Sequence, residues 1–233
     1  APCRHDFLFG FVIFILCIHS VFGQQKPDPK AASYLWSADN QKKLYYMGLY
    51  LDKELLEKKT VCESKYWLEP VSFSILQPLE FIANSPHPSK GVWTFRYRFD
   101  RCDESIVYNA LFQANPNGQP KIIPLVPGVT RASPLLARDM MPGVAMAVVK
   151  NNNDSQCKTP KIINTKVTVE PHPLKTDKEQ FDGAWEEEWT VAACSAPFTV
   201  SFCLLPRKAG GTSWIQGKCK PEDVEKALFL GKK

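Results

Sequence analysis

Apolar and polar residues alternate along the segment that begins at Gly91. The aromatic residues at every second position are Trp93, Phe95, Tyr97 and Phe99, with threonine or arginine between them. Alternation of this kind predicts a half-buried β-strand whose aromatic side chains share one face. A second apolar segment, 106–112, leads to Asn117-Gly118, a pair that tolerates the positive φ angles of a tight turn. The pattern therefore predicts an antiparallel hairpin.

The same pattern returns 92 positions later (185 − 93), where Gly183-Ala184-Trp185 repeats Gly91-Val92-Trp93. Without a gap, the further matched pairs are Tyr97 with Trp189, Cys102 with Cys194, Ile106 with Phe198, Gly118 with Gly210 and Ile123 with Ile215. We interpret this as an internal duplication; the alternative is chance similarity between aromatic β-segments. If the duplication is real, Val71–Leu125 and Ile163–Gly217 should superpose strand for strand.

Each copy is preceded by a shorter alternating strand (71–76 and 163–169) and, further upstream, by a helical segment. The first helix carries an apolar stripe after capping residues at Ser37, and the stripe consists of Leu44, Met47, Leu51 and Leu55. Ser133-Pro134 predicts the start of the second helix, and Pro142-Gly143 predicts its end. The apolar segment 144–149 fits a helix or a strand. Prolines predict loops after the first strand of each copy, at Pro78, Pro86, Pro88, Pro171 and Pro173.

These elements predict an α+β protein of two similar antiparallel β-halves with flanking helices, stabilised by disulfide bonds. We divide the chain into a signal peptide (1–23), an N-terminal lead with an amphipathic helix (24–61), a first β-half (62–128), a helical connection (129–156), a second β-half (157–219), and a C-terminal short helix and tail (220–233).

The segment Phe7–Val21 is almost entirely apolar, follows Arg4 and ends near the small residue Gly23. This is typical of a secretory signal that is cut after Gly23. The alternative is a retained anchor helix, although the apolar run is short of the roughly 20 residues that span a bilayer. We therefore expect an exported protein with no transmembrane span in its mature part.

Charge and composition narrow the classes of function. The 233 residues are 44% hydrophobic and 23% charged, with a formal net charge of +5. Basic residues are scattered and form no long run, so we expect no nucleic-acid partner. No phosphate-binding loop or dinucleotide fingerprint occurs, and we expect no cofactor.

The cysteine count agrees with export. Without Cys3 and Cys17 of the signal, six remain: Cys62, Cys102, Cys157, Cys194, Cys203 and Cys219. An even number in an oxidising compartment predicts disulfides. Their spacing does not fit zinc, so we expect no metal site.

One disulfide is predicted from the second hairpin. Cys203 precedes Gly211 by eight residues and Cys219 follows it by eight, so the two should face each other if the turn lies at Gly210-Gly211. The symmetry of the halves suggests Cys62–Cys102 and Cys157–Cys194, with a cross-link Cys102–Cys157 as the rival.

Three adjacent carboxylates, Glu186, Glu187 and Glu188, stand between Trp185 and Trp189. Paired carboxylates cleave glycosidic bonds, so a hydrolase using Glu186 or Glu188 is one hypothesis. Neighbouring strand residues point to opposite faces, however, and we favour a solvated face. We further expect Arg96 to lie near Glu186 and Glu188 on a neighbouring strand.

The sequence G-x-W…W-T-V…C…V-x-F…G-G-T, with Pro-Gly-Val-Thr-Arg-Ala-Ser-Pro-Leu-Leu-Ala-Arg-Asp between the halves, resembles uncharacterised exported proteins of Gram-negative bacteria. The resemblance covers about Gly91 to Ile215. It implies a periplasmic or cell-envelope location and no known activity, and it carries over no functional residue.

The leading hypothesis is an exported, non-enzymatic interaction or assembly protein of the cell envelope, with other envelope proteins as partners and no catalytic residue. The alternative is a small-ligand or glycan-binding module that uses Trp93, Trp185, Trp189 and Trp214. A pocket between the halves lined by these tryptophans would favour a ligand. A long uncovered strand edge or a large apolar patch would favour protein partners.

Overall fold

The computed structural model describes residues 28–56, 66–101, 104–151, 160–193 and 195–230. Two of the disulfides expected from symmetry, Cys62–Cys102 and Cys157–Cys194, lie outside the described residues, as does their rival Cys102–Cys157. The signal segment 1–23 lies outside them as well.

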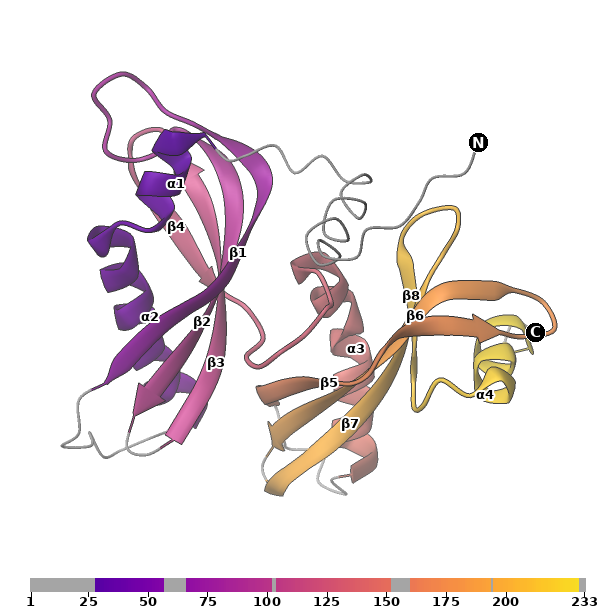
Figure 1. Ribbon diagram of the computed structural model, residues 1–233. Coiled ribbons are helices and arrows are strands. Elements are labelled where there is room, and N and C mark those ends of the chain that lie inside the picture. Colours follow the sequence, from indigo (N-terminus) through magenta and orange to yellow (C-terminus); the bar gives the residue numbers. More distant parts are fainter. Residues whose placement is uncertain (1–27, 57–65, 102–103, 152–159, 194, 231–233) are drawn as a thin grey trace, which may run out of the picture.

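The first half combines helices with a four-stranded antiparallel sheet. Its elements are α1 (Pro29–Leu35), α2 (Ala38–Leu56), β1 (Trp67–Glu80), β2 (Lys90–Arg101), β3 (Glu104–Asn115) and β4 (Gly118–Pro124). The strands are neighbours in chain order, β1-β2-β3-β4. Figure 1 shows α1 and α2 along one face of this sheet.

The second half repeats this plan. Its elements are α3 (Pro134–Asn151), β5 (Lys161–Lys175), β6 (Gln180–Ala193), β7 (Ser195–Pro206), β8 (Thr212–Gln216), α4 (Pro221–Glu225) and η1 (Lys226–Leu230). The strand order is again the chain order, β5-β6-β7-β8, and α3 covers one face (Figure 1). The repeating unit is therefore a helix followed by a four-stranded meander.

The pairing register confirms the duplication. Trp93 lies opposite Phe112 in the first sheet and Trp185 lies opposite Leu204 in the second, and both members are shifted by 92 (185 − 93 and 204 − 112). The last strand pair keeps the same offset, because Leu111 faces Ile123 and Cys203 faces Ile215. The first strand differs: Phe73 faces Phe95 while Val167 faces Glu187, an offset of 94 (167 − 73).

Alternate residues of β2 and β3 form the core under α2. The fully buried aromatic side chains there are Trp93, Phe95, Tyr97, Phe99, Tyr108 and Phe112. The hydroxyl of Ser37 accepts a hydrogen bond from the backbone N–H of Asn40, as its predicted capping role requires. Leu44 and Leu51 of the predicted stripe are buried against the aromatic layer.

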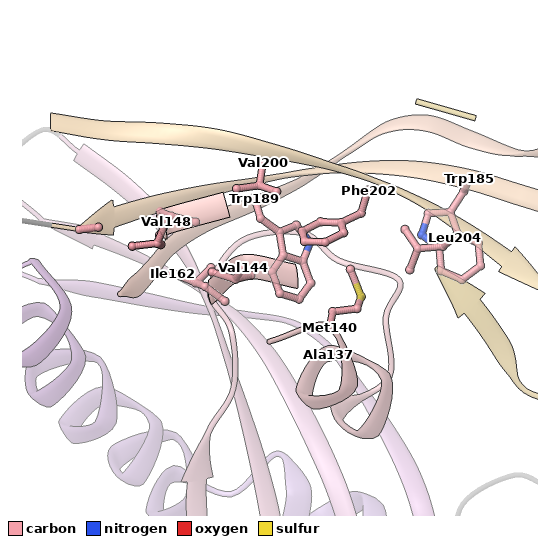
Figure 2. Packing of buried hydrophobic residues seen from close by; sticks show 12 residues of the cluster. Ala137, Met140, Val144, Val148, Ile162, Trp185, Trp189, Val200, Phe202 and Leu204 are labelled. Carbon is pink, nitrogen blue, oxygen red and sulfur yellow. The ribbon is translucent and has the colours of Figure 1, made fainter. Parts of the chain in front are cut away.

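The second core lies between α3 and the second sheet (Figure 2). It contains Met140, Val144 and Val148 of the helix, with Trp189, Val200 and Phe202 of the sheet. The helix was predicted to end at Pro142-Gly143, and that prediction is wrong, because α3 continues to Asn151. Proline at position 142 removes the bond to the carbonyl of Arg138, whose side chain is exposed, while Met140 and Val144 on either side stay buried.

Gly143 is a packing residue rather than a helix breaker. A Cβ atom at this position would lie 2.8 Å from the ring of Trp214 and 3.0 Å from that of Phe202. Glycine therefore lets the helix backbone approach the sheet closely.

Two predicted proline loops are also corrected. β1 continues past Pro78 to Glu80, and β5 continues past Pro171 and Pro173 to Lys175, with register irregularities around His172. Both strands are at sheet edges, where a residue without an N–H donor is tolerated.

The disulfide Cys203–Cys219 is present, with 5.0 Å between the two Cα atoms. The pairing was predicted correctly, but the predicted register was wrong, because Cys203 faces Ile215. Cys219 lies three residues beyond the end of β8 and turns back at Gly217, where φ is +121°. The disulfide thus fastens the segment after β8 to β7.

Candidate functional site

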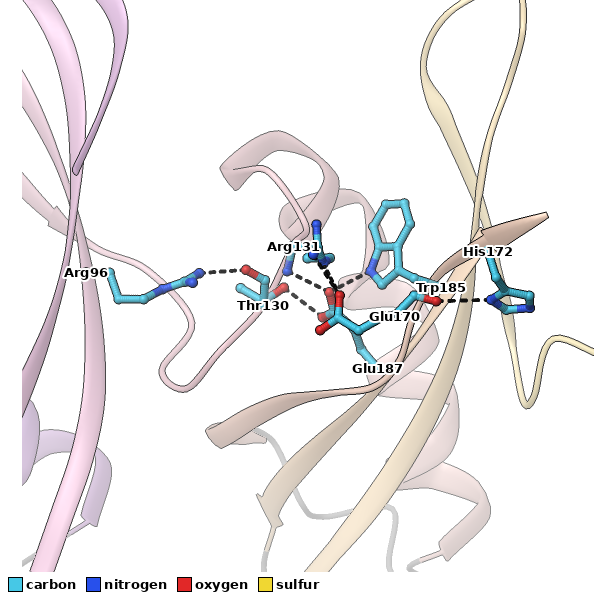
Figure 3. A network of polar contacts seen from close by, with 7 residues as sticks. All are labelled: Arg96, Thr130, Arg131, Glu170, His172, Trp185 and Glu187. Atoms are coloured by element: carbon cyan, nitrogen blue, oxygen red, sulfur yellow. Dashed lines mark hydrogen bonds and ion pairs between the residues drawn. The ribbon is translucent and has the colours of Figure 1, made fainter. Parts of the chain in front are cut away.

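A buried carboxylate organises the junction between the halves (Figure 3). Glu187 of β6 is fully buried and accepts four hydrogen bonds; Figure 3 draws those from Thr130, Arg131 and Trp185. The indole Nε1 atoms of Trp185 and Trp189 donate at 2.8 Å to Oε1 and Oε2 respectively. The Thr130 hydroxyl donates to Oε2 at 2.7 Å, and the Arg131 backbone N–H donates to Oε1 at 2.8 Å. The carboxylate therefore connects Thr130 and Arg131, just before α3, to strand β6.

Glu186 and Glu188 point to the opposite face from Glu187, as strand alternation requires. Glu186 accepts a hydrogen bond from the backbone N–H of Cys219 at 2.7 Å. Glu188 forms an ion pair with Lys166 at 2.8 Å, and the hydrogen bond from Lys166 lowers the pKa of Glu188. The predicted solvated face is wrong for Glu186 and Glu187, which are both buried. Glu186 and Glu188 share one face, and the Lys218 ammonium lies between them, 3.4 Å from Glu186 and 3.5 Å from Glu188.

Arg96 connects the first sheet to the same junction. Its Nε donates to Oδ1 of Asn109 at 3.0 Å, and its Nη2 donates to the carbonyl of Thr130 at 2.6 Å. Burial lowers the pKa of Arg96, and the charge of Glu187 opposes this effect. The expected approach of Arg96 to Glu186 and Glu188 on a neighbouring strand is wrong, because β2 and β6 belong to different sheets.

Asn109 and Gly128 complete the junction. The Asn109 side-chain N–H groups donate to the carbonyls of Val126 and Gly128 at 2.8 and 2.9 Å. Gly128 has φ of +92°, and a Cβ atom there would lie 2.2 Å from the backbone oxygen of Thr165. The Thr165 carbonyl in turn accepts the N–H of Val129 at 2.7 Å. The linker between β4 and α3 is therefore bonded to both sheets.

A cavity of about 480 Å³ lies between the first sheet and α3. Its sheet side is the face that α2 does not cover, where Ser74, Thr94 and Arg96 lie next to Asn109. Strands β1, β2 and β4 also contribute Ser72, Phe73, Phe95, Ile123 and Pro124. The other lining residues come from the linker and the first turns of α3, and they are Leu125, Val126, Thr130, Ala132, Pro134, Ala137, Arg138 and Met141. The cavity combines an apolar wall with polar groups on the sheet.

The structure does not bring the four candidate tryptophans to this cavity. Trp93 is buried in the first core, stacked on Phe112. Trp185 and Trp189 bind Glu187 in the second core, and Trp214 packs edge-on against Phe202. None of the four lines the space between the halves.

A second buried ion pair holds α2 to the first sheet. Asp52 accepts hydrogen bonds from Nε of Arg101 at 2.7 Å and from the Tyr108 hydroxyl at 2.6 Å. All three residues are buried, and they lie between α2, which carries Asp52, and the first sheet. Its geometry is that of a structural ion pair.

β1 exposes several large apolar side chains along one edge of the first sheet. It has 14 residues and pairs only with β2 among the described strands. Most of its residues are exposed, and buried and exposed positions do not alternate regularly along it. Val71 is 53% exposed and Leu76 is 52% exposed, and Trp67 and Ile75 are exposed as well. The sequence signal for this edge was the apolar segment 71–76, which was predicted only to be a strand.

Among the described residues, no cluster of histidine, cysteine or acidic side chains could hold a metal ion. In that part of the chain, no helix has the length and apolar character needed to cross a membrane. No protein-family model, curated protein or solved structure matches this chain.

Proposed function

We propose that this is an exported, non-enzymatic interaction protein of the cell envelope, and that it binds an extended segment of a partner protein by strand addition at β1. The observation that carries the proposal is the open, largely uncharged edge of β1. An added strand gains affinity from main-chain hydrogen bonds and specificity from the side chains beside it.

The central segment of β1 lacks the charged side chains that protect many edge strands. Natural edge strands avoid pairing with other chains by means of lysines, prolines, bulges or short length. β1 contains no lysine or arginine, and the seven residues from Val71 to Gln77, between Pro70 and Pro78, carry no charge. Register irregularities lie at both ends of Ser72–Ile75, which leaves a regular central segment.

The other sheet edges are less suited to the same role. β5 has two prolines, as β1 has, and in addition carries three lysines, at 161, 166 and 175. β4 and β8 have only seven and five residues. Among these edge strands, β1 is therefore the one whose length and lack of lysines best suit strand addition.

Two features support export. The apolar segment Phe7–Val21 is typical of a secretory signal. The Cys203–Cys219 disulfide fits an oxidising compartment. The envelope location rests on the resemblance to exported proteins of Gram-negative bacteria.

The non-enzymatic assignment rests on how the candidate acids are used. Glu186 accepts a hydrogen bond from the backbone N–H of Cys219. Both carboxylate oxygens of Glu187 accept hydrogen bonds, from four donors in all. Glu188 pairs with Lys166. A hydrolase would need two carboxylates that are free to flank one glycosidic bond.

The test is site-specific photo-crosslinking in the envelope fraction of the source organism. A photoreactive phenylalanine analogue replaces Leu76 on β1 or, as a matched control, Val149 on α3, which is 75% exposed. We expect a discrete adduct from position 76 and none from position 149. A Val71→Lys change in the same chain should remove the adduct, because it places a charge on the pairing segment.

Adducts of equal yield from both positions would contradict the proposal. So would an adduct at position 76 that persists with Val71→Lys. An adduct with a second copy of this chain would overturn the partner assignment and identify β1 as a self-association edge.

A further inference from the structure

The cavity between the first sheet and α3 has the chemistry of a binding site for an organic anion. It occupies about 480 Å³ and lies against the sheet face opposite α2. Volumes of roughly 300–1,000 Å³ with mainly apolar walls and a few placed polar groups are typical of small-molecule sites. The walls here are formed by residues such as Val126, Ala137 and Met141.

The charge in the cavity has one sign. Arg96 and Arg138 line it, and none of the described residues in its lining is an acid. The charge of Glu187 acts on Arg96, but Glu187 does not line the cavity and its carboxylate is bound by four donors. An anion that entered the cavity would meet positive charge without a competing carboxylate in the wall.

Two hydrogen bonds hold the guanidinium of Arg96 and leave some of its N–H donors unused. A guanidinium has five N–H donors. Two of them are used, by Asn109 and by the Thr130 carbonyl, and three have no acceptor among the described residues. Two fixed hydrogen bonds orient the planar group in advance, which suits bidentate binding of a carboxylate. Burial also lowers the pKa of Arg96, which reflects a charge that is incompletely solvated.

The duplication gives a comparison within the chain. The position equivalent to Arg96 in the second half is Glu188 (96 + 92), and it pairs with Lys166. The second sheet thus carries a closed ion pair where the first carries an arginine with free donors. The arginine is a feature of the first half alone.

We propose that this cavity binds an amphipathic carboxylate, with the carboxylate on Arg96 and the apolar body against the linker and α3. This inference goes beyond strand addition, because it concerns the face of the first sheet and the α3 wall rather than the edge of β1. Arg138, which also lines the cavity, contributes a weaker attraction, because its side chain is exposed and pairs with Asp139.

The test is calorimetric titration of the folded protein with decanoate and with the neutral analogue decanol. We expect decanoate to bind at one site and decanol to bind about tenfold or more weakly, because only the acid forms charge-assisted hydrogen bonds with the guanidinium. The Arg96→Gln variant should bind decanoate about as weakly as the parent binds decanol.

The matched control is Arg98→Gln. Arg98 lies two residues further along the same face of β2, pairs with Glu69 and Asp100, and does not line the cavity. This variant should bind decanoate like the parent. If Arg96→Gln fails to fold, Thr94→Trp replaces it, since a large ring at that position would fill the cavity and abolish binding.

Four results would overturn the proposal. One is equal affinity for decanoate and decanol, and another is an equal loss in the Arg96 and Arg98 variants. The third is decanoate binding that Thr94→Trp leaves unchanged. Absence of any decanoate binding at millimolar concentration would overturn it as well.

Discussion

Glu187 occupies in the second half the position that Phe95 occupies in the first (187 − 95 = 92), and each faces the equivalent residue of the next strand, Phe202 and Ala110. Phe95 packs edge-on against Trp36, just before α2, with 6.2 Å between ring centroids. Glu187 instead binds Thr130 and the Arg131 backbone, just before α3. The two copies thus hold the start of their helix by aromatic packing in one case and by hydrogen bonds in the other.

Replacing Glu187 with glutamine should destabilise the fold by roughly 2–6 kcal/mol. An amide nitrogen cannot accept a hydrogen bond, so two of the four donors around Glu187 lose their acceptor, and each buried unsatisfied group costs about 1–3 kcal/mol. Urea unfolding followed by tryptophan fluorescence measures the change. Glu188→Gln is the matched control, and we expect a loss below about 1 kcal/mol, because Glu188 forms a partly exposed ion pair. Equal losses in both variants would contradict the role given to Glu187.

Removing the Asp52 carboxylate should cost about 3–5 kcal/mol, because the buried charge of Arg101 then keeps only its longer, 3.5 Å ion pair with the exposed Glu104. Asp52→Ala tests this by chemical denaturation. The double variant Asp52→Leu/Arg101→Met should recover part of the loss, since both charges are then absent. A single variant as stable as the parent would show that the ion pair does not anchor α2.

Alkaline pH should unfold the protein through its buried tyrosines. Burial, and then the hydrogen bond to Asp52, raise the pKa of the Tyr108 phenol, and burial also raises the pKa values of Tyr34 and Tyr97. A group whose pKa is raised in the folded state stabilises that state fully below its unfolded pKa, about 10, and the contribution is lost as pH rises above it.

Absorbance titration at the tyrosinate band, with near-ultraviolet circular dichroism alongside, checks this expectation. These three phenols should ionise only together with the loss of tertiary signal. Ionisation of all the tyrosines before any loss of tertiary signal would contradict it.

Gly128→Ala should destabilise the protein by about 1–3 kcal/mol more than Gly210→Ala, because the new methyl group collides with the backbone of Thr165. Both glycines have positive φ, +92° and +96°, so alanine is strained at either site. A Cβ at Gly210 meets no atom within 4 Å, so the difference isolates the contact between the linker and β5. Urea midpoints of the two variants give the comparison, and equal midpoints would contradict a tight contact at Gly128.

Much of the architecture could be predicted from the sequence, because it depends on local residue patterns. Strand alternation, the Asn117-Gly118 turn and the caps at Ser37 and Ser133 each act within a few residues. The exceptions are positions where tertiary contacts override a local preference. Pro142-Gly143 stays within α3 because Gly143 lets the helix pack against Trp214.

The candidate site was harder to predict from the sequence, because the cavity forms between elements that are distant in sequence. Arg96 was noticed, but its partners Asn109 and Thr130 depend on where the linker runs. Glu187 was expected to be solvated, since nothing in the local sequence shows that two indoles and the linker converge on it. The disulfide Cys203–Cys219 was found by assuming a register that β7 and β8 do not have.

The central claim, strand addition at β1, is tested most directly by hydrogen-exchange mass spectrometry of the protein alone and with the partner captured at position 76. The proposal predicts slower exchange of the backbone amides within Val71–Gln77 in the complex, because new main-chain hydrogen bonds form along that edge. Exchange in α3 should not change. Unchanged exchange across Val71–Gln77, with protection appearing elsewhere, would contradict the claim.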